Sequence, residues 1–419
     1  MTTKKLSIEK QCQNAHSERH RMNALSSQKK NKALKSMANA LRNNIQLILN
    51  ANKIDIKNGK KNNLTNSLID RLSLSEKRLL EIANAIESII TLDEPIGIII
   101  KKWKQEDGLE IKKITVPIGV IGMIYEARPN VTADAISLAI KTNNCIVLRG
   151  SSSAYNSNKA ITDVLKTAAT QCEIPKNAIQ LLEDTSRESV KKFVQMNQYL
   201  NLIIPRGGAT LIQHVCNSAT VPTIETGSGN CHIYVDKYAN LEKAHNIIIN
   251  AKLNRPSVCN AAESLLIHEK VATLFLPKIL KSLTEQNVEI KGCNTTCKLF
   301  NATKPATSKD WETEYLGLTI SVKVIPSIES AICHINEYGS MHTEVIISEN
   351  KKNITKFQHQ VDASTVISNA SSRFTDGGKF GFGAEIGIST QKLHARGPMG
   401  LAEMTSYKYV ITGSGQTRI

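Results

Sequence analysis

The chain has 419 residues, a length that fits two or three domains with a cleft between them and not one small core. Hydrophobic residues make up 41% of it and aromatic residues only 4%, a composition typical of a soluble α/β protein built on aliphatic side chains. No stretch approaches about eighteen consecutive apolar residues, and the first residues contain no apolar signal segment. We therefore expect a cytoplasmic protein with no membrane partner.

The net charge of +16 raises the question of a nucleic-acid partner. Interleaved aromatic residues are missing, however, and much of the lysine occurs with asparagine in polar stretches such as 57–63. This pattern favours a general bias in composition over a surface selected to follow phosphates, so we expect no nucleic-acid partner. A basic nucleic-acid-binding protein built on an inactive enzyme scaffold is the alternative from another class.

The nine cysteines are odd in number and follow no framework spacing, which indicates reduced thiols in a reducing compartment. Cys293 and Cys297 have the wrong gap for a zinc knuckle and no matching second pair. We expect no metal site.

The first ninety or so residues read as helices, because apolar residues recur at spacings of three and four over 34–48 and again over 79–90, where Ser75 is the expected cap. Asp107-Gly108 then separates two strand-like runs, a strong hairpin signal. A two-stranded ribbon is not stable alone. The run 407–412 is its natural partner, from the same chain or from another subunit.

From Pro117 onward apolar strands alternate with helices, the pattern of a doubly wound parallel sheet. The expected strands cover 120–124, 145–148 and 202–204, and the expected helices 133–140 and 211–215. The turns after the second and third strands contain Arg149, Gly150, Ser151 and Ser152, and Gly207 and Gly208. Such turns bind phosphates at helix N-termini, although the usual G-x-G-x-x-G fingerprint is absent.

Cys259 lies in the polar turn Arg255-Pro-Ser-Val-Cys259-Asn260, which leads into an apolar run. The turn presents the sulfur at the end of an element, beside a cation that favours the thiolate. A thiolate forms covalent acyl adducts, so we expect Cys259 to be a nucleophile, whereas a small buried hydrophobe is the default for the other cysteines.

Two further segments accompany this thiol. Glu225 precedes the Gly-rich turn 227–229 and lies 34 positions before Cys259, and Glu314-Tyr-Leu-Gly317 follows it. The order resembles the aldehyde dehydrogenase superfamily, which implies that Glu314 binds the nicotinamide ribose. Leu316 stands where the superfamily has an aromatic residue.

Five segments carry a more specific resemblance, to the γ-glutamyl phosphate reductase family, which extends over nearly the whole chain. These segments are 120–131, 255–261, 338–344, 373–378 and 383–401. It implies NADPH-dependent reduction of L-glutamate 5-phosphate to L-glutamate 5-semialdehyde and phosphate through a Cys259 thioester, in proline biosynthesis. It also implies a homo-oligomer and functional coupling to glutamate 5-kinase. The rivals are an aldehyde dehydrogenase that oxidises another aldehyde to its acid, and one that transfers the acyl group to coenzyme A.

Within this hypothesis the backbone N–H of Cys259 and the side chain of Asn130 are the expected oxyanion donors. Glu225 supports cofactor geometry or proton movement, or else only caps a turn. Arg149 and the neighbouring hydroxyls suit the 2′-phosphate of NADPH. The expected substrate-binding residues are Arg128, Arg255, Asn260 and Arg396, and Arg373 also lies in a matched segment. Each arginine could equally pair with a structural carboxylate, and the sequence does not rank them.

The expected fold is aldehyde dehydrogenase-like α/β, with the active site in a cleft between two domains. A Rossmann-type cofactor domain comprises 1–97 and 117–228, and an α/β catalytic domain comprises 229–400. Residues 98–116 and 401–419 form a small β-ribbon for oligomerisation.

Overall fold

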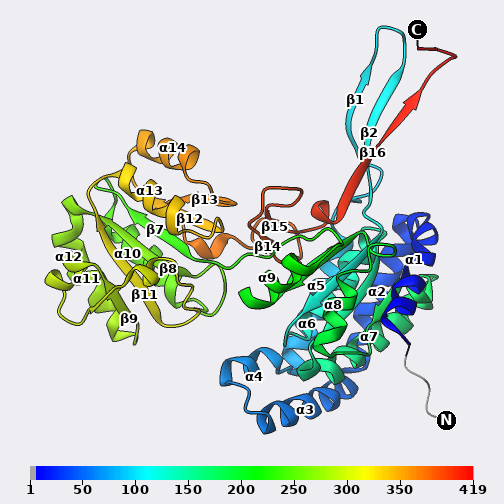
Figure 1. Ribbon diagram of the computed structural model, residues 1–419, viewed down its shortest axis with the longest axis horizontal. Helices are drawn as coiled ribbons and strands as arrows, with labels where there is room; N and C mark the ends of the chain where they lie inside the picture. The colour runs from blue at the N-terminus through cyan, green and yellow to red at the C-terminus, as the bar shows by residue number, and fades with distance from the viewer. Residues whose placement is uncertain (1–5, 419) are drawn as a thin grey trace. The chain divides into compact units, whose positions relative to one another are not determined.

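The computed structural model describes residues 6–418, and the chain divides into two compact units (Figure 1). Unit 1 comprises Met1–Thr226, Gly381–Gly387 and Met399–Ile419, and unit 2 comprises Gly227–Phe380 and Ile388–Pro398. The three strands of the ribbon belong to unit 1, and Cys259 belongs to unit 2.

Unit 1 begins with five helices, as the apolar spacing predicts. They are α1 (Ile8–Asn23), α2 (Ser27–Asn43), α3 (Ile45–Lys61), α4 (Asn66–Leu72) and α5 (Glu76–Ile90). The predicted stripe on α2 is buried, with Leu34, Met37 and Leu41 fully inaccessible. The predicted cap of α5 is also present, because Ser75 Oγ accepts a hydrogen bond from the Arg78 N–H at 3.2 Å.

The sheet of unit 1 is parallel and has the order β5-β4-β3-β6. Its strands are β3 (Val120–Tyr125), β4 (Cys145–Gly150), β5 (Ile179–Leu181) and β6 (Leu202–Arg206), and the helices among them are α6 (Asn130–Lys141), α7 (Tyr155–Thr170), α8 (Arg187–Phe193) and α9 (Ala209–Ser218). The strand and helix predictions for this region are confirmed. The loops after β4 and β6 therefore leave the same edge of the sheet, where phosphate groups bind in such folds.

The ribbon is a three-stranded antiparallel sheet of order β1-β2-β16 (Figure 1). Its strands are β1 (Ile99–Lys104), β2 (Glu110–Pro117) and β16 (Thr405–Thr412). The hairpin prediction is confirmed, since Gly108 takes the left-handed φ of +89° that its turn requires. The C-terminal run pairs with β2 of its own chain, and large apolar side chains of the ribbon are exposed, among them Ile99, Tyr409 and Ile411.

Unit 2 is built on a seven-stranded parallel sheet of order β10-β9-β11-β8-β7-β12-β13. The strands are β7 (Cys231–Val235), β8 (Ala262–His268), β9 (Glu289–Gly292), β10 (Lys304–Pro305), β11 (Thr319–Ile325), β12 (Thr343–Ile347) and β13 (Thr365–Ser368). The helices are α10 (Leu241–Leu253), α11 (Glu269–Glu285), α12 (Asn294–Leu299), α13 (Ile328–Tyr338) and α14 (Lys351–Gln360). A two-stranded sheet, β14 (Ile388–Ser389) with β15 (Gly397–Pro398), completes this unit.

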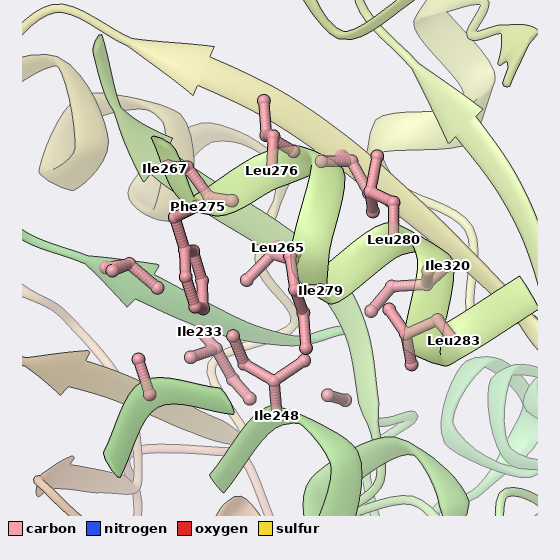
Figure 2. Close-up of a cluster of buried hydrophobic side chains, with 14 of the residues drawn as sticks. Ile233, Ile248, Leu265, Ile267, Phe275, Leu276, Ile279, Leu280, Leu283 and Ile320 are labelled. Carbon is pink, nitrogen blue, oxygen red and sulfur yellow. The ribbon is translucent and has the colours of Figure 1, made fainter. Parts of the chain in front are cut away.

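Alternate residues of these strands enter two separate cores, because side chains of a strand point to opposite faces in turn. Leu265 and Ile267 pack with α10 and α11 (Figure 2), whereas Leu266 packs with α13 and α14. Helices thus cover both faces of the sheet. The packed sheet holds β7 and β8 in fixed register, and with them the turns that precede these strands.

In the part of the chain that the structure describes, residues 6–418, no helix combines the length and the apolar character needed to span a bilayer.

The packing of α11 predicts that two nearby leucines of this helix contribute very differently to the free energy of unfolding. Leu276→Ala empties space in the fully buried cluster of Figure 2 and should lower the free energy of unfolding by about 2–5 kcal/mol. Leu274 is 60% exposed on the same helix, so Leu274→Ala should change it by less than about 0.5 kcal/mol. Urea unfolding followed by circular dichroism measures both. Equal losses would contradict the packing described for this unit.

Candidate active site

The nucleophile candidate Cys259 lies in a turn between α10 and β8 and is half-buried. Arg255 takes a left-handed φ of +58°, and the N–H of Val258 donates to its carbonyl at 3.3 Å. The Ala261 N–H then donates to the Val258 carbonyl at 3.0 Å, immediately before β8. The turn predicted from the sequence is confirmed, and it keeps the thiol at the amino end of a fully buried strand.

The Gly-rich segment that follows Glu225 lies directly against this turn. A Cβ atom on Gly229 would lie 1.5 Å from the carbonyl oxygen of Cys259, so only glycine fits there. The N–H of Gly229 donates to Glu314 Oε1 at 2.7 Å. Three of the sequence segments singled out above therefore meet within unit 2.

Asn260 ties the same turn to the short helix η4 (Ser372–Phe374). Its Nδ2 donates to the Thr375 carbonyl at 2.8 Å, and its own carbonyl accepts from Ser372 Oγ at 2.6 Å. Oδ1 of Asn260 is buried and has no hydrogen-bond partner. One end of the amide thus holds the turn in place, and the other is an acceptor that a bound ligand could use.

A second thiol lies behind the first. Cys231 Sγ lies 3.1 Å from the Cys259 carbonyl oxygen and is fully buried. Burial raises the pKa of Cys231 well above its ordinary value, with nearby carboxylates adding to the effect. Burial likewise raises the pKa of Cys12 and of Cys145 to about 12. These thiols are protonated at neutral pH and do not compete with Cys259 as nucleophiles.

The pKa of the Cys293 thiol is lowered. Burial opposes this shift, but hydrogen bonds from Thr296 Oγ1 and from the backbone N–H of Val324 outweigh it. Cys293 precedes the short helix α12 and is half-buried. Alkylation experiments must therefore separate Cys293 from Cys259.

In unit 1, Arg149 is the penultimate residue of β4, and its guanidinium is directed at the loop before α8. Nη2 donates to the carbonyls of Thr185 and Ser186 at 2.7 and 2.8 Å, and Nε donates to Ser189 Oγ at 3.3 Å. These bonds fix the loop after β5 to the end of β4.

The residues after Arg149 are shaped by close packing. A Cβ atom on Gly150 would lie 2.1 Å from Asn158 Nδ2, so a side chain is excluded there. Ser151 Oγ and Ser153 Oγ share a hydrogen bond of 2.8 Å. Ser152 lines a cavity of about 880 Å³ that Lys192 of α8 also lines. Lys192 could not be identified from the sequence, because its place beside this cavity depends on the packing of α8.

Gly207 and Gly208 lie between β6 and α9. The N–H of Gly208 donates to Glu126 Oε2 at 2.9 Å, and a Cβ atom on Gly207 would lie 2.7 Å from the Glu126 carboxyl carbon. The N-terminus of α9 thus already binds an anionic oxygen, in a cradle that a side chain would fill. Both features fit the pyrophosphate of a dinucleotide, whose oxygens would take the place of the Glu126 carboxylate.

The other expected catalytic residues also belong to unit 1. Asn130 is the exposed first residue of α6, and its Nδ2 donates to Asp134 Oδ2 at 3.2 Å. Glu225 is exposed and lies beside Cys216. The pKa of the Cys216 thiol is raised to about 11, mainly by burial and further by the Glu225 carboxylate.

The expected substrate-binding arginines differ in their surroundings. Arg396 Nη2 forms an ion pair with Asp362 at 2.7 Å, and Lys392 shares this carboxylate at 2.5 Å. Arg128 is half-buried, and its N–H donates to the Glu126 carbonyl at 2.6 Å. Arg255 is exposed in the Cys259 turn. Within residues 6–418, no group of three or more His, Cys, Asp or Glu side chains is arranged to hold a metal ion.

Comparisons with known proteins identify the family. The profile of the Aldehyde dehydrogenase family matches residues 2–296. A γ-glutamyl phosphate reductase from Thermoanaerobacter pseudethanolicus is 53% identical over 413 residues, which cover 99% of this chain and 100% of that protein. One from Clostridium novyi is 50% identical over 404 residues, 96% of this chain and 97% of that protein.

Among solved structures, γ-glutamyl phosphate reductase from Thermotoga maritima superposes with a TM-score of 0.96 at 47% identity, covering 98% of this chain and 100% of that one. An acetylating aldehyde dehydrogenase from Geobacillus thermoglucosidasius, at 18% identity, shares the fold with a TM-score of 0.71 over 98% of this chain and 97% of that one. The predicted fold class and family are confirmed. The chain belongs to the aldehyde dehydrogenase family and, within it, to the γ-glutamyl phosphate reductases.

Proposed function

We propose that this protein reduces L-glutamate 5-phosphate to L-glutamate 5-semialdehyde with release of phosphate, the second step of proline biosynthesis from glutamate. The observation that carries the proposal is a half-buried thiol, Cys259, held at a strand end in a chain that is 53% identical to a γ-glutamyl phosphate reductase over its whole length. We place the reaction in the cytoplasm, where thiols stay reduced.

The chemistry begins at the Cys259 sulfur. Its thiolate attacks the acyl carbon of the substrate, and the tetrahedral oxyanion is stabilised by the Cys259 backbone N–H and by Asn130 Nδ2. The C–O bond to phosphate then breaks with its electron pair on the leaving oxygen, so that a thioester remains. Phosphate is a good leaving group and needs little help from a general acid.

Members of the aldehyde dehydrogenase family use a nicotinamide cofactor, and the reduced form supplies the hydride that converts the thioester to a thiohemiacetal. Gly207 and Gly208 would hold its pyrophosphate, and Glu314, fixed by the Gly229 N–H, its ribose. Collapse of the thiohemiacetal releases the aldehyde and restores the thiolate. Because water would hydrolyse the thioester wastefully, Glu225 supports cofactor geometry or proton movement and does not activate water.

NADPH is the cofactor that we propose, with Arg149 and the hydroxyls of Ser151 and Ser152 at its 2′-phosphate. The acyl phosphate is labile, so a glutamate 5-kinase is the expected functional neighbour. We also propose that the ribbon joins copies of this chain, because its three strands leave Ile99, Tyr409 and Ile411 exposed and exposed apolar surface of this kind is typical of a protein–protein contact.

Removing the sulfur tests the nucleophile. Cys259→Ala should abolish NADP-dependent turnover of glutamate semialdehyde in the presence of phosphate and should leave the melting temperature within about 3 °C, because a half-buried thiol contributes little packing. Cys293→Ala is the matched control and should keep its activity. Retained turnover in Cys259→Ala would refute the thioester route, and a large loss of stability would show that Cys259 is part of a core.

The 2′-phosphate role of Arg149 is tested by comparing the two reduced cofactors. Arg149→Ala should raise KM for NADPH about 10-fold or more, the effect of losing a charge-assisted hydrogen bond, while KM for NADH changes about 2-fold or less. Arg149→Lys keeps the charge, so its KM for NADPH should lie between that of the wild-type protein and that of Arg149→Ala. Equal losses for NADPH and NADH would mean that Arg149 only positions the 185–186 loop.

The ribbon proposal is tested by molar mass in solution. Replacing two exposed apolar residues of the ribbon together, Tyr409→Asp with Ile411→Asp, should lower the mass measured by light scattering from that of an oligomer toward that of one chain. The control Leu274→Asp places a charge at an exposed leucine on α11 and should leave the mass unchanged. An unchanged mass for the double ribbon variant would rule the ribbon out as the contact.

A further inference from the structure

The segment around Arg373 is bound directly to the residue that follows the nucleophile. Ser372 Oγ donates to the Asn260 carbonyl at 2.6 Å, and Asn260 Nδ2 donates to the Thr375 carbonyl at 2.8 Å. These two bonds lie on either side of Arg373 in the sequence. Arg373 is therefore held beside the Cys259 turn within unit 2, whatever the position of the other unit.

Arg373 is half-buried and is not neutralised by a close carboxylate. Its Nε is buried without a hydrogen-bond partner, and among residues 6–418 neither Arg373 nor Arg255 forms an ion pair. Burial lowers the pKa of Arg373, and the nearby charge of Arg255 lowers it further, while Asp376 and the Cys259 thiol act in the opposite direction. Two guanidinium groups thus lie within electrostatic range of each other and of the nucleophile, an arrangement that an anion would stabilise.

The neighbouring histidines are fully buried. His232 is fully buried, and its Nδ1 contacts Glu344 Oε2 at 3.1 Å. His342 Nδ1 contacts Thr343 Oγ1 at 2.8 Å and Cys231 Sγ at 3.7 Å. Neither ring is therefore open to a substrate, whereas Arg255 is exposed and Arg373 is half-buried.

We propose that Arg373, together with Arg255, binds the phosphate group of the acyl phosphate substrate. This assignment rests on the proposed function and adds a residue and a role to it. The phosphate is bonded through one oxygen to the carbon that Cys259 attacks, so it must lie within a few ångströms of the sulfur, whereas the α-carboxylate is several carbons away. As the S–C bond forms and the C–O bond breaks, negative charge grows on the departing phosphate, and the planar guanidinium donors stabilise it.

Inorganic phosphate is the probe, because the reverse reaction consumes it. With glutamate semialdehyde and NADP, Arg373→Ala should raise KM for phosphate about 10- to 100-fold, the range for a charge-assisted hydrogen bond, while KM for the semialdehyde and for NADP changes about 3-fold or less. Arg373→Lys should recover part of the loss. The control Lys270→Ala removes one exposed positive charge from the same unit and should leave KM for phosphate unchanged.

A second measurement does not depend on turnover. Iodoacetamide alkylation of Cys259, read by mass spectrometry on its peptide and so separated from Cys293, should be slowed by phosphate in the wild-type protein. It should not be slowed in Arg373→Ala. The rate of alkylation by the anionic reagent iodoacetate, relative to that by neutral iodoacetamide, should also be lower in this variant than in the wild-type protein.

Two distinct results would overturn the assignment. Wild-type KM for phosphate and full phosphate protection in Arg373→Ala would refute the arginine site alone and leave the reductase function intact. Phosphate-independent turnover in the wild-type protein would refute the proposed function itself, and the phosphate site with it.

Discussion

The contact on which the site depends is the approach of Gly229 to the carbonyl of Cys259. The backbone at Gly229 passes so close that a Cβ atom would lie 1.5 Å from that oxygen, and the Gly229 N–H is bonded to Glu314 at 2.7 Å. One glycine therefore connects the nucleophile turn with the carboxylate assigned to the cofactor ribose. A methyl group there would displace both, so the position constrains the chemistry although it supplies no reacting atom.

Around this contact, unit 2 combines a buried sheet with a partly exposed turn that carries the nucleophile. The parallel sheet is buried on both faces, and β8 starts three residues after Cys259 with every side chain inaccessible. The turn itself is only half-buried, and Asn260 secures it to η4 through two hydrogen bonds. The sulfur thus has a fixed position and access for a substrate. Cys231, sealed behind it, has neither the exposure nor the ionisation that catalysis needs.

Much of this could be predicted from the sequence, for physical reasons that differ from element to element. The helix of Leu34 and Met37 and the strands β3 and β4 follow from apolar periodicity, and Asp107-Gly108 identifies its hairpin because few other pairs adopt that turn. Cys259 was identifiable because a lone thiol in an Arg-containing turn is chemically unusual. Arg396 was selected as a substrate ligand on similarity alone, and the structure pairs it with Asp362, a residue 34 positions away that no local pattern connects to it.

Other features could not be derived from local patterns. Arg373, Lys192 and Glu126 depend on which loops meet in space, and the hydrogen bonds of Asn260 to Ser372 and Thr375 cross more than a hundred residues of chain. Covalent catalysis by the Cys259 sulfur can be tested by mass spectrometry after mixing the protein with glutamate semialdehyde and NADP without phosphate. We expect a burst of about one NADPH per active site, a γ-glutamyl adduct on Cys259, and sustained turnover once phosphate is added. Sustained turnover without phosphate, or a Cys259 peptide that never carries the acyl group, would contradict it.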